Sequence, residues 1–223
     1  MPVLDVTIPV RDGEQVSGLW QAPDDARACL VLAHGAGAGM SHRSMAAVAD
    51  GLERLGVASL RYQFPYMQRG SRRVDSPAVA QAAVRAAVAF ARERAGGLPL
   101  FAGGRSFGGR MTAQAQAAEP LAGVRGLVFF AFPLHLAGKP STERAAHLAE
   151  VEVPMLFLQG TNDPLARLDL LQEVVASLGP RATLQLVQDA DHSFHVPART
   201  GRKDDAVMAE ALAEVAAWIG ERS

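Results

Sequence analysis

The sequence predicts an α/β protein with a mostly parallel central sheet, covered by helices on both faces and preceded by an antiparallel pair of strands. Two observations lead to this prediction. Short apolar runs alternate with longer amphipathic stretches from Ala28 onward, and runs that are apolar on both sides suit strands buried between two layers of helices. The alternation also implies right-handed crossovers and a doubly wound sheet. We expect residues 1–223 to form a single domain with only a minimal cap.

The first predicted element is the antiparallel pair. The segments Val3–Val10 and Gln15–Gln21 mix β-branched and polar residues on either side of an Arg-Asp-Gly turn, which is typical of a hairpin. Buried strands follow, most of them with a helix behind them. They are 29–33 with helix Met45–Leu55, 57–62 with Val79–Arg94, 98–103 with Met111–Ala118, 126–132 alone, 155–160 with Leu168–Leu178, and 183–187 with Asp205–Ile219.

Composition and charge exclude several classes of protein. The chain has 22 basic and 23 acidic side chains, a net charge of −1, whereas nucleic-acid binders are usually far more basic. Its one cysteine rules out an intramolecular disulfide and a thiolate zinc site. The start lacks a signal-peptide pattern, and the most apolar stretch, 121–138, is broken by an arginine, a proline and a histidine. We therefore expect a cytoplasmic protein, a monomer or small homo-oligomer, with neither membrane nor nucleic acid as partner.

A strand-to-helix turn in the middle of the chain carries the strongest motif. Residues 104–108 read Gly-Arg-Ser-Phe-Gly, the Gly-x-Ser-x-Gly pattern in which a strained turn lifts the serine above the sheet and its neighbours must lack bulk. Ser106 is therefore the predicted nucleophile; the alternative is a glycine-rich turn with an incidental serine. Arg105 and Arg110 are expected to brace neighbouring loops rather than touch a substrate.

A serine hydroxyl needs a base and a third group that orients the base. On a sheet of this kind the partners follow along the chain as acid and then histidine, each beyond the end of a strand. Asp163 follows the strand at 155–160, and His192 lies in the loop after the strand at 183–187. We therefore predict a triad of Ser106, His192 and Asp163.

Other side chains near His192 compete for these roles. His195 is a rival base, and Asp189 and Asp191 are rival acids, although Asp191 is too close in sequence to reach His192 from behind. Asp163 can instead shape the turn before the next proline, a common role of aspartate. The same carboxylates and histidines lack the His-x-x-x-His pair of zinc sites, so we expect no metal and no cofactor.

The loop after the first buried strand, residues 34–39, is predicted to complete the site. Acyl transfer needs backbone N–H groups aimed at the charge that develops on the carbonyl oxygen. One is expected from Phe107, the residue after the nucleophile, and the other from Ala36, with Gly37 as the alternate. His34 is expected to stabilise the turn. A dinucleotide fingerprint fails here, because the third glycine of Gly-x-Gly-x-x-Gly is missing.

Two further segments bear on the substrate. Between Phe130 and Asp163 only about two dozen residues are free to form a cap, which favours an open cleft and small or exposed acyl groups. An arginine in the loop after the strand at 57–62 can bind an anionic acyl group or phosphate; the alternative, which we favour, is a solvated loop whose aromatic residues pack on the domain. The candidate substrate contacts are Gly37, Phe64, Tyr66, Arg69 and His195.

Several segments together resemble a known family: HGAGAGMSHRSM (34–45), LRYQFPYM (60–67), GGRSFGGRM (103–111), LQGTNDP (158–164) and DHSF (191–194). The chain is similar to the α/β-hydrolase superfamily, in the group related to dienelactone hydrolases, and there to testis-expressed and nonspecific-lethal-complex-subunit-like predicted hydrolases. The resemblance covers about Cys29 to the carboxyl terminus. It implies the α/β-hydrolase fold and supports the triad and the two oxyanion donors named above. True dienelactone hydrolases carry a cysteine at the position of Ser106.

These observations predict a serine hydrolase, resembling carboxylesterases or thioesterases, that cleaves the ester or thioester bonds of small acyl substrates through an acyl-enzyme. The alternative is a non-catalytic protein-interaction module on the same fold, since the resembled group includes scaffolds of chromatin complexes. An intact triad argues against that alternative. A large exposed apolar surface or an obstructed Ser106 would favour it.

Overall fold

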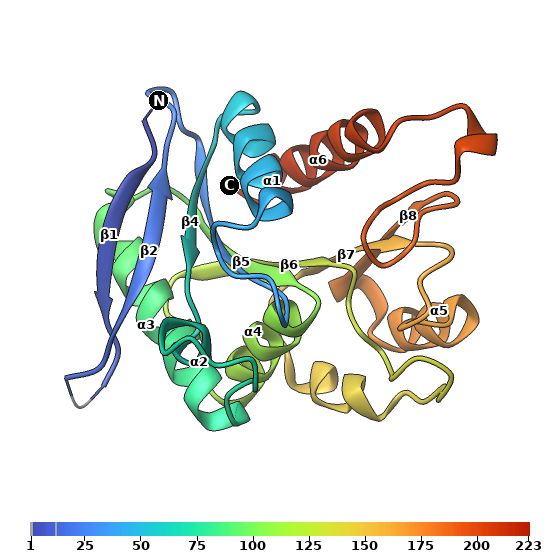
Figure 1. Ribbon diagram of the computed structural model, residues 1–223, viewed down its shortest axis with the longest axis horizontal. Coiled ribbons are helices and arrows are strands. Elements are labelled where there is room, and N and C mark those ends of the chain that lie inside the picture. Colours follow the sequence, from blue (N-terminus) through green and yellow to red (C-terminus); the bar gives the residue numbers. More distant parts are fainter. Residues whose placement is uncertain (1, 12) are drawn as a thin grey trace.

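In residues 2–11 and 13–223, which the computed structural model describes, eight strands form one sheet in the order β1-β2-β4-β3-β5-β6-β7-β8 (Figure 1). Strands β3 to β8 are parallel to one another, whereas β2 pairs antiparallel with both β1 and β4. The predicted antiparallel pair and mostly parallel sheet are therefore confirmed. The bounds are β1 (Leu4–Pro9), β2 (Gln15–Gln21), β3 (Ala28–Ala33), β4 (Val57–Tyr62), β5 (Leu100–Arg105), β6 (Val124–Phe130), β7 (Met155–Gly160) and β8 (Ala182–Val187). Asp12, in the predicted turn, lies outside the described residues.

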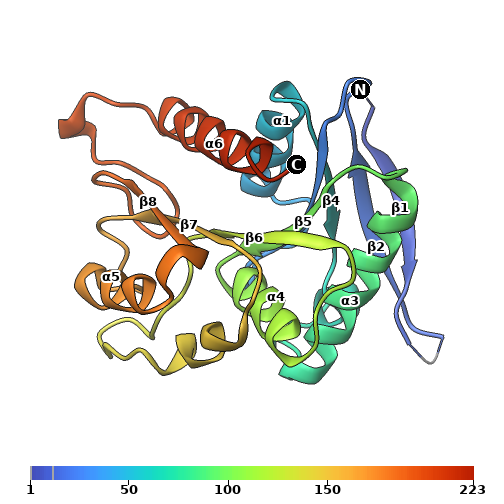
Figure 2. The same ribbon diagram turned by 180° about the vertical axis from the view of Figure 1, so that it is seen from behind.

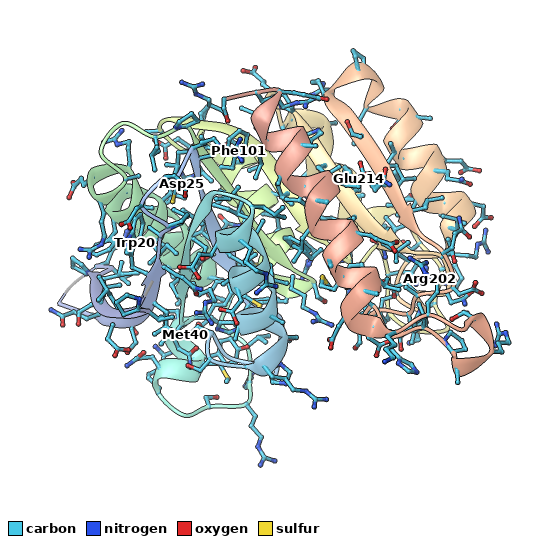
Figure 3. The ribbon with its side chains drawn as sticks, turned by 90° about the horizontal axis from the view of Figure 1, so that it is seen from above. Trp20, Asp25, Met40, Phe101, Arg202 and Glu214 are labelled. Atoms are coloured by element: carbon cyan, nitrogen blue, oxygen red, sulfur yellow. The ribbon has the colours of Figure 1, made fainter. Side chains whose placement is uncertain are left out.

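Helices cover both faces of the sheet, as predicted (Figure 2). On one face, α1 (Arg43–Arg54) and α6 (Asp204–Gly220) pack against each other, and Figure 3 shows them side by side. The other face carries α3 (Pro77–Arg94), α4 (Phe107–Ala118) and α5 (Leu168–Ser177). The remaining turns are α2 (Pro65–Gln68) and the 3₁₀ segments η1 (Glu143–Glu150), η2 (Gly179–Arg181) and η3 (Ala198–Thr200).

Strand β3 illustrates how a continuous apolar run serves two cores. Every residue of β3 is buried. Successive side chains of a strand point to opposite faces, so Cys29 and Val31 join the core beneath α3 and α4, while Leu30 and Leu32 join the core beneath α1 and α6. This is why the central strands show no apolar–polar alternation in the sequence.

The main difference from the predicted elements lies at α4, which begins at Phe107 rather than at Met111. Gly108 and Gly109 are poor helix formers, so the first turn shows no helical signal. They allow close packing instead: a Cβ at Gly109 would lie 2.7 Å from the carbonyl oxygen of Gly104. The short α2 and η1 were not predicted.

The segment between β6 and β7 is short. It consists of an irregular loop and η1, which packs against α4 (the yellow helix below α4 in Figure 1). The predicted minimal cap is therefore confirmed, and the carboxyl edge of the sheet carries no separate lid domain in the described part of the chain. None of the helices in that part is both long and apolar enough to cross a membrane. The cytoplasmic location stays a prediction.

Candidate active site

Ser106 occupies a strained position between β5 and α4. Its backbone has φ 50° and ψ −115°, a region that side-chain-bearing residues rarely adopt and that often marks functional sites. The surrounding glycines allow the turn to lie against the end of β3. A Cβ at Gly104 would lie 2.4 Å from the carbonyl oxygen of Ala33, and one at Gly108 would lie 2.5 Å from that of His34. The turn therefore requires glycine on both sides of Ser106.

The three residues of the predicted triad lie in hydrogen-bond contact. His192, in the loop after β8, has its Nε2 atom 2.9 Å from Ser106 Oγ and its Nδ1 atom 2.7 Å from Asp163 Oδ2. Asp163 follows β7, and its side chain is fully buried, whereas that of His192 is 22% exposed. Burial thus decreases from Asp163 to His192, and Ser106 is itself partly exposed.

Two further groups, in addition to the His192 imidazole, donate hydrogen bonds to the Asp163 carboxylate. Gln159 Nε2 donates to Oδ2 at 2.6 Å, and the Leu165 N–H donates to Oδ1 at 2.8 Å. Because an ionised carboxylate only accepts hydrogen bonds, His192 Nδ1 must carry the proton in its contact with Asp163. Nε2 is then the unprotonated nitrogen and can accept from the Ser106 hydroxyl.

Gln159 is a functional residue that the sequence reasoning missed. It is fully buried in β7 and shares Asp163 Oδ2 with His192. The signal available in the sequence was a glutamine in the otherwise apolar run MLFLQG. A buried polar side chain in a central strand needs a partner, and here the partner is Asp163.

The rival residues make other contacts. Asp191 Oδ1 accepts from the backbone N–H groups of two residues that follow it, one of them His195, and so shapes the loop. His195 Nδ1 lies 2.8 Å from Asp204 Oδ2, and its side chain is 63% exposed. Asp189 forms an ion pair of 3.6 Å with Arg199. In residues 2–11 and 13–223, no cluster of three or more histidine, cysteine or acidic side chains is arranged to hold a metal ion.

The loop after β3 lies against the serine turn. A Cβ at Gly35 would be 3.7 Å from Ser106 Cβ, so the following residue, Ala36, is next to the reacting centre. Phe107 is the first residue of α4, where amides lack intrahelical partners. Within the part of the chain that the structure describes, neither the Ala36 nor the Phe107 amide donates a hydrogen bond. Two backbone N–H groups near the serine turn are therefore available to donate hydrogen bonds to a ligand oxygen.

Residues at the end of β4 hold this loop in place. Gln63 Oε1 accepts from the Met40 N–H at 2.9 Å, and the Phe64 N–H donates to His34 Nε2 at 3.0 Å. Burial lowers the pKa of His34, and its Nδ1 lies 2.8 Å from the Gly35 carbonyl oxygen. His34 is thus a neutral ring that links the loop to β4. Gln63 was not predicted, since nothing local in the sequence pairs it with Met40.

Two of the candidate substrate contacts pack beneath the serine turn. Phe64 and Tyr66 are 0% and 1% exposed, and their rings contact Phe107 at centroid distances of 5.3 and 6.4 Å. Arg69 is bound to the carboxylates of Glu14 and Asp75.

Gly37, in contrast, is exposed beside Ala36 with φ 78°. Its place, at the rim of the site, is open to a ligand. The roles of Gly37, Phe64, Tyr66, Arg69 and His195 in substrate binding stay predictions.

Arg105 supports the loop that carries His192. Its Nη2 atom donates to the His192 carbonyl oxygen at 3.3 Å. Burial lowers the pKa of this guanidinium, while the nearby carboxylates of Asp191 and Asp163 oppose that effect. Arg105 therefore braces a neighbouring loop, in line with the expectation from the sequence.

The alpha/beta hydrolase domain model matches residues 26–220. This chain belongs to the alpha/beta hydrolase family. The match includes all residues of the site described above, and the hydrolase fold agrees with the strand order.

Solved structures of similar fold come from several hydrolases. A serine hydrolase without lid from Xanthomonas campestris is 20% identical, with 98% of this chain and 96% of that chain covered and a TM-score of 0.74. A dienelactone hydrolase from Anabaena variabilis is 20% identical, with 99% and 96% covered and a TM-score of 0.75. The esterase domain of a Rhodothermus marinus protein is 15% identical, with 98% of both chains covered and a TM-score of 0.74. At these identities the likeness concerns the fold alone.

Proposed function

We propose that this chain is a serine hydrolase that cleaves the carboxylic ester or thioester bonds of small acyl substrates through an acyl-enzyme. The observation that carries the proposal is the pair of hydrogen bonds that joins Ser106 Oγ to His192 Nε2 and His192 Nδ1 to Asp163. The names of the similar structures, a serine hydrolase, a dienelactone hydrolase and an esterase domain, support hydrolytic chemistry.

In the proposed mechanism, Ser106 Oγ bonds to the acyl carbon and its proton moves to His192 Nε2. The carbonyl electron pair moves onto the oxygen, which accepts hydrogen bonds from the Ala36 and Phe107 amides. Collapse of this intermediate breaks the bond to the alcohol or thiol, which takes the proton from His192. A water molecule then repeats the sequence on the acyl-enzyme and releases the acid. Asp163 stays ionised and stabilises the imidazolium.

The absence of a lid domain from the described chain supports a small acyl substrate. The segment between β6 and β7 forms no such domain, so it offers no long tunnel for an acyl chain. We therefore expect hydrolysis to be fastest for short acyl chains, which a series of 4-nitrophenyl esters of increasing length measures.

The proposal is tested by covalent labelling of the purified protein with a fluorophosphonate, which reacts with activated serines. We expect labelling of the wild type and none of Ser106→Ala, with the same melting temperature for both proteins. If the folded wild type does not react, the proposal of a serine hydrolase is wrong. The interaction module then becomes the leading explanation, and pull-down of partners is the next experiment.

A further inference from the structure

Arg110, one helical turn after the predicted nucleophile, lies close to two basic side chains of η1. Arg110 is in the first turn of α4, and its N–H bonds to the Ser106 carbonyl oxygen, so the two Cα atoms are about 6 Å apart. Arg144 and His147 belong to η1, which packs against α4. We call these three residues the basic cluster.

The basic cluster borders the carboxyl edge of the sheet. The ring of His147 lies 6.4 Å from that of Phe132, which follows β6. Arg144 Nη1 contacts the carbonyl oxygen of His135, in the same loop, at 3.4 Å. The cluster thus lies where α4, η1 and the loop after β6 meet, at the end of the sheet that also carries Ser106.

No counter-charge accompanies these side chains. In the described part of the chain, the side chain of Arg110 takes part in no hydrogen bond or ion pair, and neither Arg144 nor His147 forms an ion pair. Within the basic cluster, two nitrogens are buried without a partner, Nε of Arg110 and Nε2 of His147. The pKa of Arg110 is lowered by burial and by the charge of Arg144, and burial and Arg110 together lower that of His147 to about 4. At neutral pH, two guanidinium groups therefore share a half-buried space with a neutral imidazole.

The contrast with Arg105, on the other side of Ser106, shows what the cluster lacks. The guanidinium of Arg105 is also partly buried, but the carboxylates of Asp191 and Asp163 compensate for its charge. Buried charges in proteins are normally paired or hydrogen-bonded. The Arg110 guanidinium is also partly buried but has no carboxylate partner in the described chain. Such a cation is suited to bind the anionic group of a ligand.

We propose that Arg110 and Arg144, with His147 as a neutral donor, form a subsite for an anionic group of the substrate, a carboxylate or a phosphate. Guanidinium groups bind such anions through paired N–H donors. The inference rests on the proposed hydrolase activity and narrows it: the natural substrate is an acidic ester or thioester, whose charged group lies within a few bonds of the scissile carbonyl.

The first test compares substrates that differ only in charge. On the acyl side, these are 4-nitrophenyl hydrogen glutarate and its methyl ester; on the leaving-group side, they are the butyrate esters of 4-hydroxybenzoate and of its methyl ester. At constant ionic strength, we expect the wild type to prefer one anionic member by roughly ten- to hundredfold in kcat/KM, the size of a charge-assisted contact. The pair that shows the preference identifies the side of the substrate that carries the charge.

Substitutions then assign the preference to residues. Arg110→Gln and Arg144→Gln are expected to bring the ratio of anionic to neutral kcat/KM close to one. Arg110→Lys keeps the positive charge but lacks the paired N–H donors of a guanidinium, so it should keep part of the preference for the anionic substrate. Arg92→Gln, at an exposed position of α3, makes the same change of charge and should leave the ratio as in the wild type. A wild type without an anionic preference, or a preference that survives Arg110→Gln, overturns the subsite.

A binding measurement separates this proposal from the hydrolase proposal, because it needs no turnover. Glutarate and inorganic phosphate are titrated into Ser106→Ala protein in a calorimeter, with and without Arg110→Gln. Binding that Arg110→Gln weakens at least about tenfold supports the subsite even if no ester is hydrolysed. Ester hydrolysis without an anionic preference, together with no anion binding, overturns the subsite and leaves the hydrolase proposal standing.

Discussion

The two sides of Ser106 are built in opposite ways. On the β7–β8 side, Asp163 accepts three hydrogen bonds and His192 has a partner at each ring nitrogen. On the β3–β4 side, the amides of Ala36 and Phe107 have no partner within the described chain, although side chains beneath them hold their loop. In the proposed mechanism, the first side holds charge that is present from the start. The second meets a charge that exists only during the reaction, so its donors stay free until then.

The largest effect is expected on the β7–β8 side, from the base. His192→Ala removes the acceptor of the serine proton and should lower kcat by about 10⁵- to 10⁶-fold, as loss of a triad histidine does elsewhere. His195→Ala is the matched control, because the same loop turns His195 outward to Asp204; its effect should stay below about fivefold, the size of an exposed ion pair. Ester hydrolysis measures both. Similar losses in the two variants would contradict the assignment of His192.

The orienting acid comes next. Asp163→Asn keeps the shape but offers an amide N–H toward His192 Nδ1, which favours the wrong tautomer and should lower kcat by about 10⁴-fold. Asp191→Asn, a change in the rival acid, weakens contacts within the loop, removes a carboxylate near Arg105 and should lower kcat by no more than about tenfold. The comparison requires melting temperatures within a few degrees of the wild type. A larger loss for Asp191→Asn would show that the acid has been misassigned.

A smaller effect is expected on the β3–β4 side, where a side chain acts through the backbone. Gln63→Leu leaves the Met40 N–H without its acceptor, so the loop that carries Ala36 loosens. Loss of a whole oxyanion donor lowers the rate by about 10²- to 10³-fold. Displacement of the Ala36 amide should lower kcat/KM by roughly tenfold. The change should lie in kcat more than in KM, because the contact exists only in the transition state.

Gln81→Leu is the control for that change, since Gln81 lies on α3 and its side chain hydrogen-bonds to Gln114 of α4. Steady-state kinetics with one short ester compare the two variants. If Gln63→Leu raises KM and leaves kcat unchanged, the loop takes part in ground-state binding rather than in oxyanion stabilisation.

The difference between the two sides also explains which residues could be predicted from the sequence. Ser106, Asp163 and His192 each follow the end of a strand, and the carboxyl ends of parallel strands meet at one edge. Their approach in the structure follows from strand order alone. The apolar runs likewise predicted the sheet, because a strand buried on both faces has no polar side to show.

The supporting residues depend on contacts that no local pattern encodes. Gln63 reaches Met40 across the gap between two loops, and Arg110 meets Arg144 only because η1 packs on α4. Both contacts form only in the folded structure, which brings together residues that are far apart in the sequence. Gln159 is intermediate, since its burial was predictable from the strand but its partner was not.

The smallest expected effect concerns the stability of the loop that carries the predicted base. Asp204 raises the pKa of His195 above its ordinary 6.5, and His195 lowers that of Asp204 below 3.8. Because the pKa of His195 is raised and that of Asp204 is lowered in the folded state, the pair stabilises the fold fully between pH 3.8 and 6.5. It loses this contribution as the pH rises through the raised value of His195 or falls through the lowered value of Asp204. His195→Gln should therefore melt slightly below the wild type at about pH 5.5 and together with it at about pH 9, and the gap at the lower pH should shrink in about 1 M salt. Thermal unfolding at both pH values measures this. A gap that grows with pH would mean that His195 stabilises the loop as a neutral ring and not through its charge.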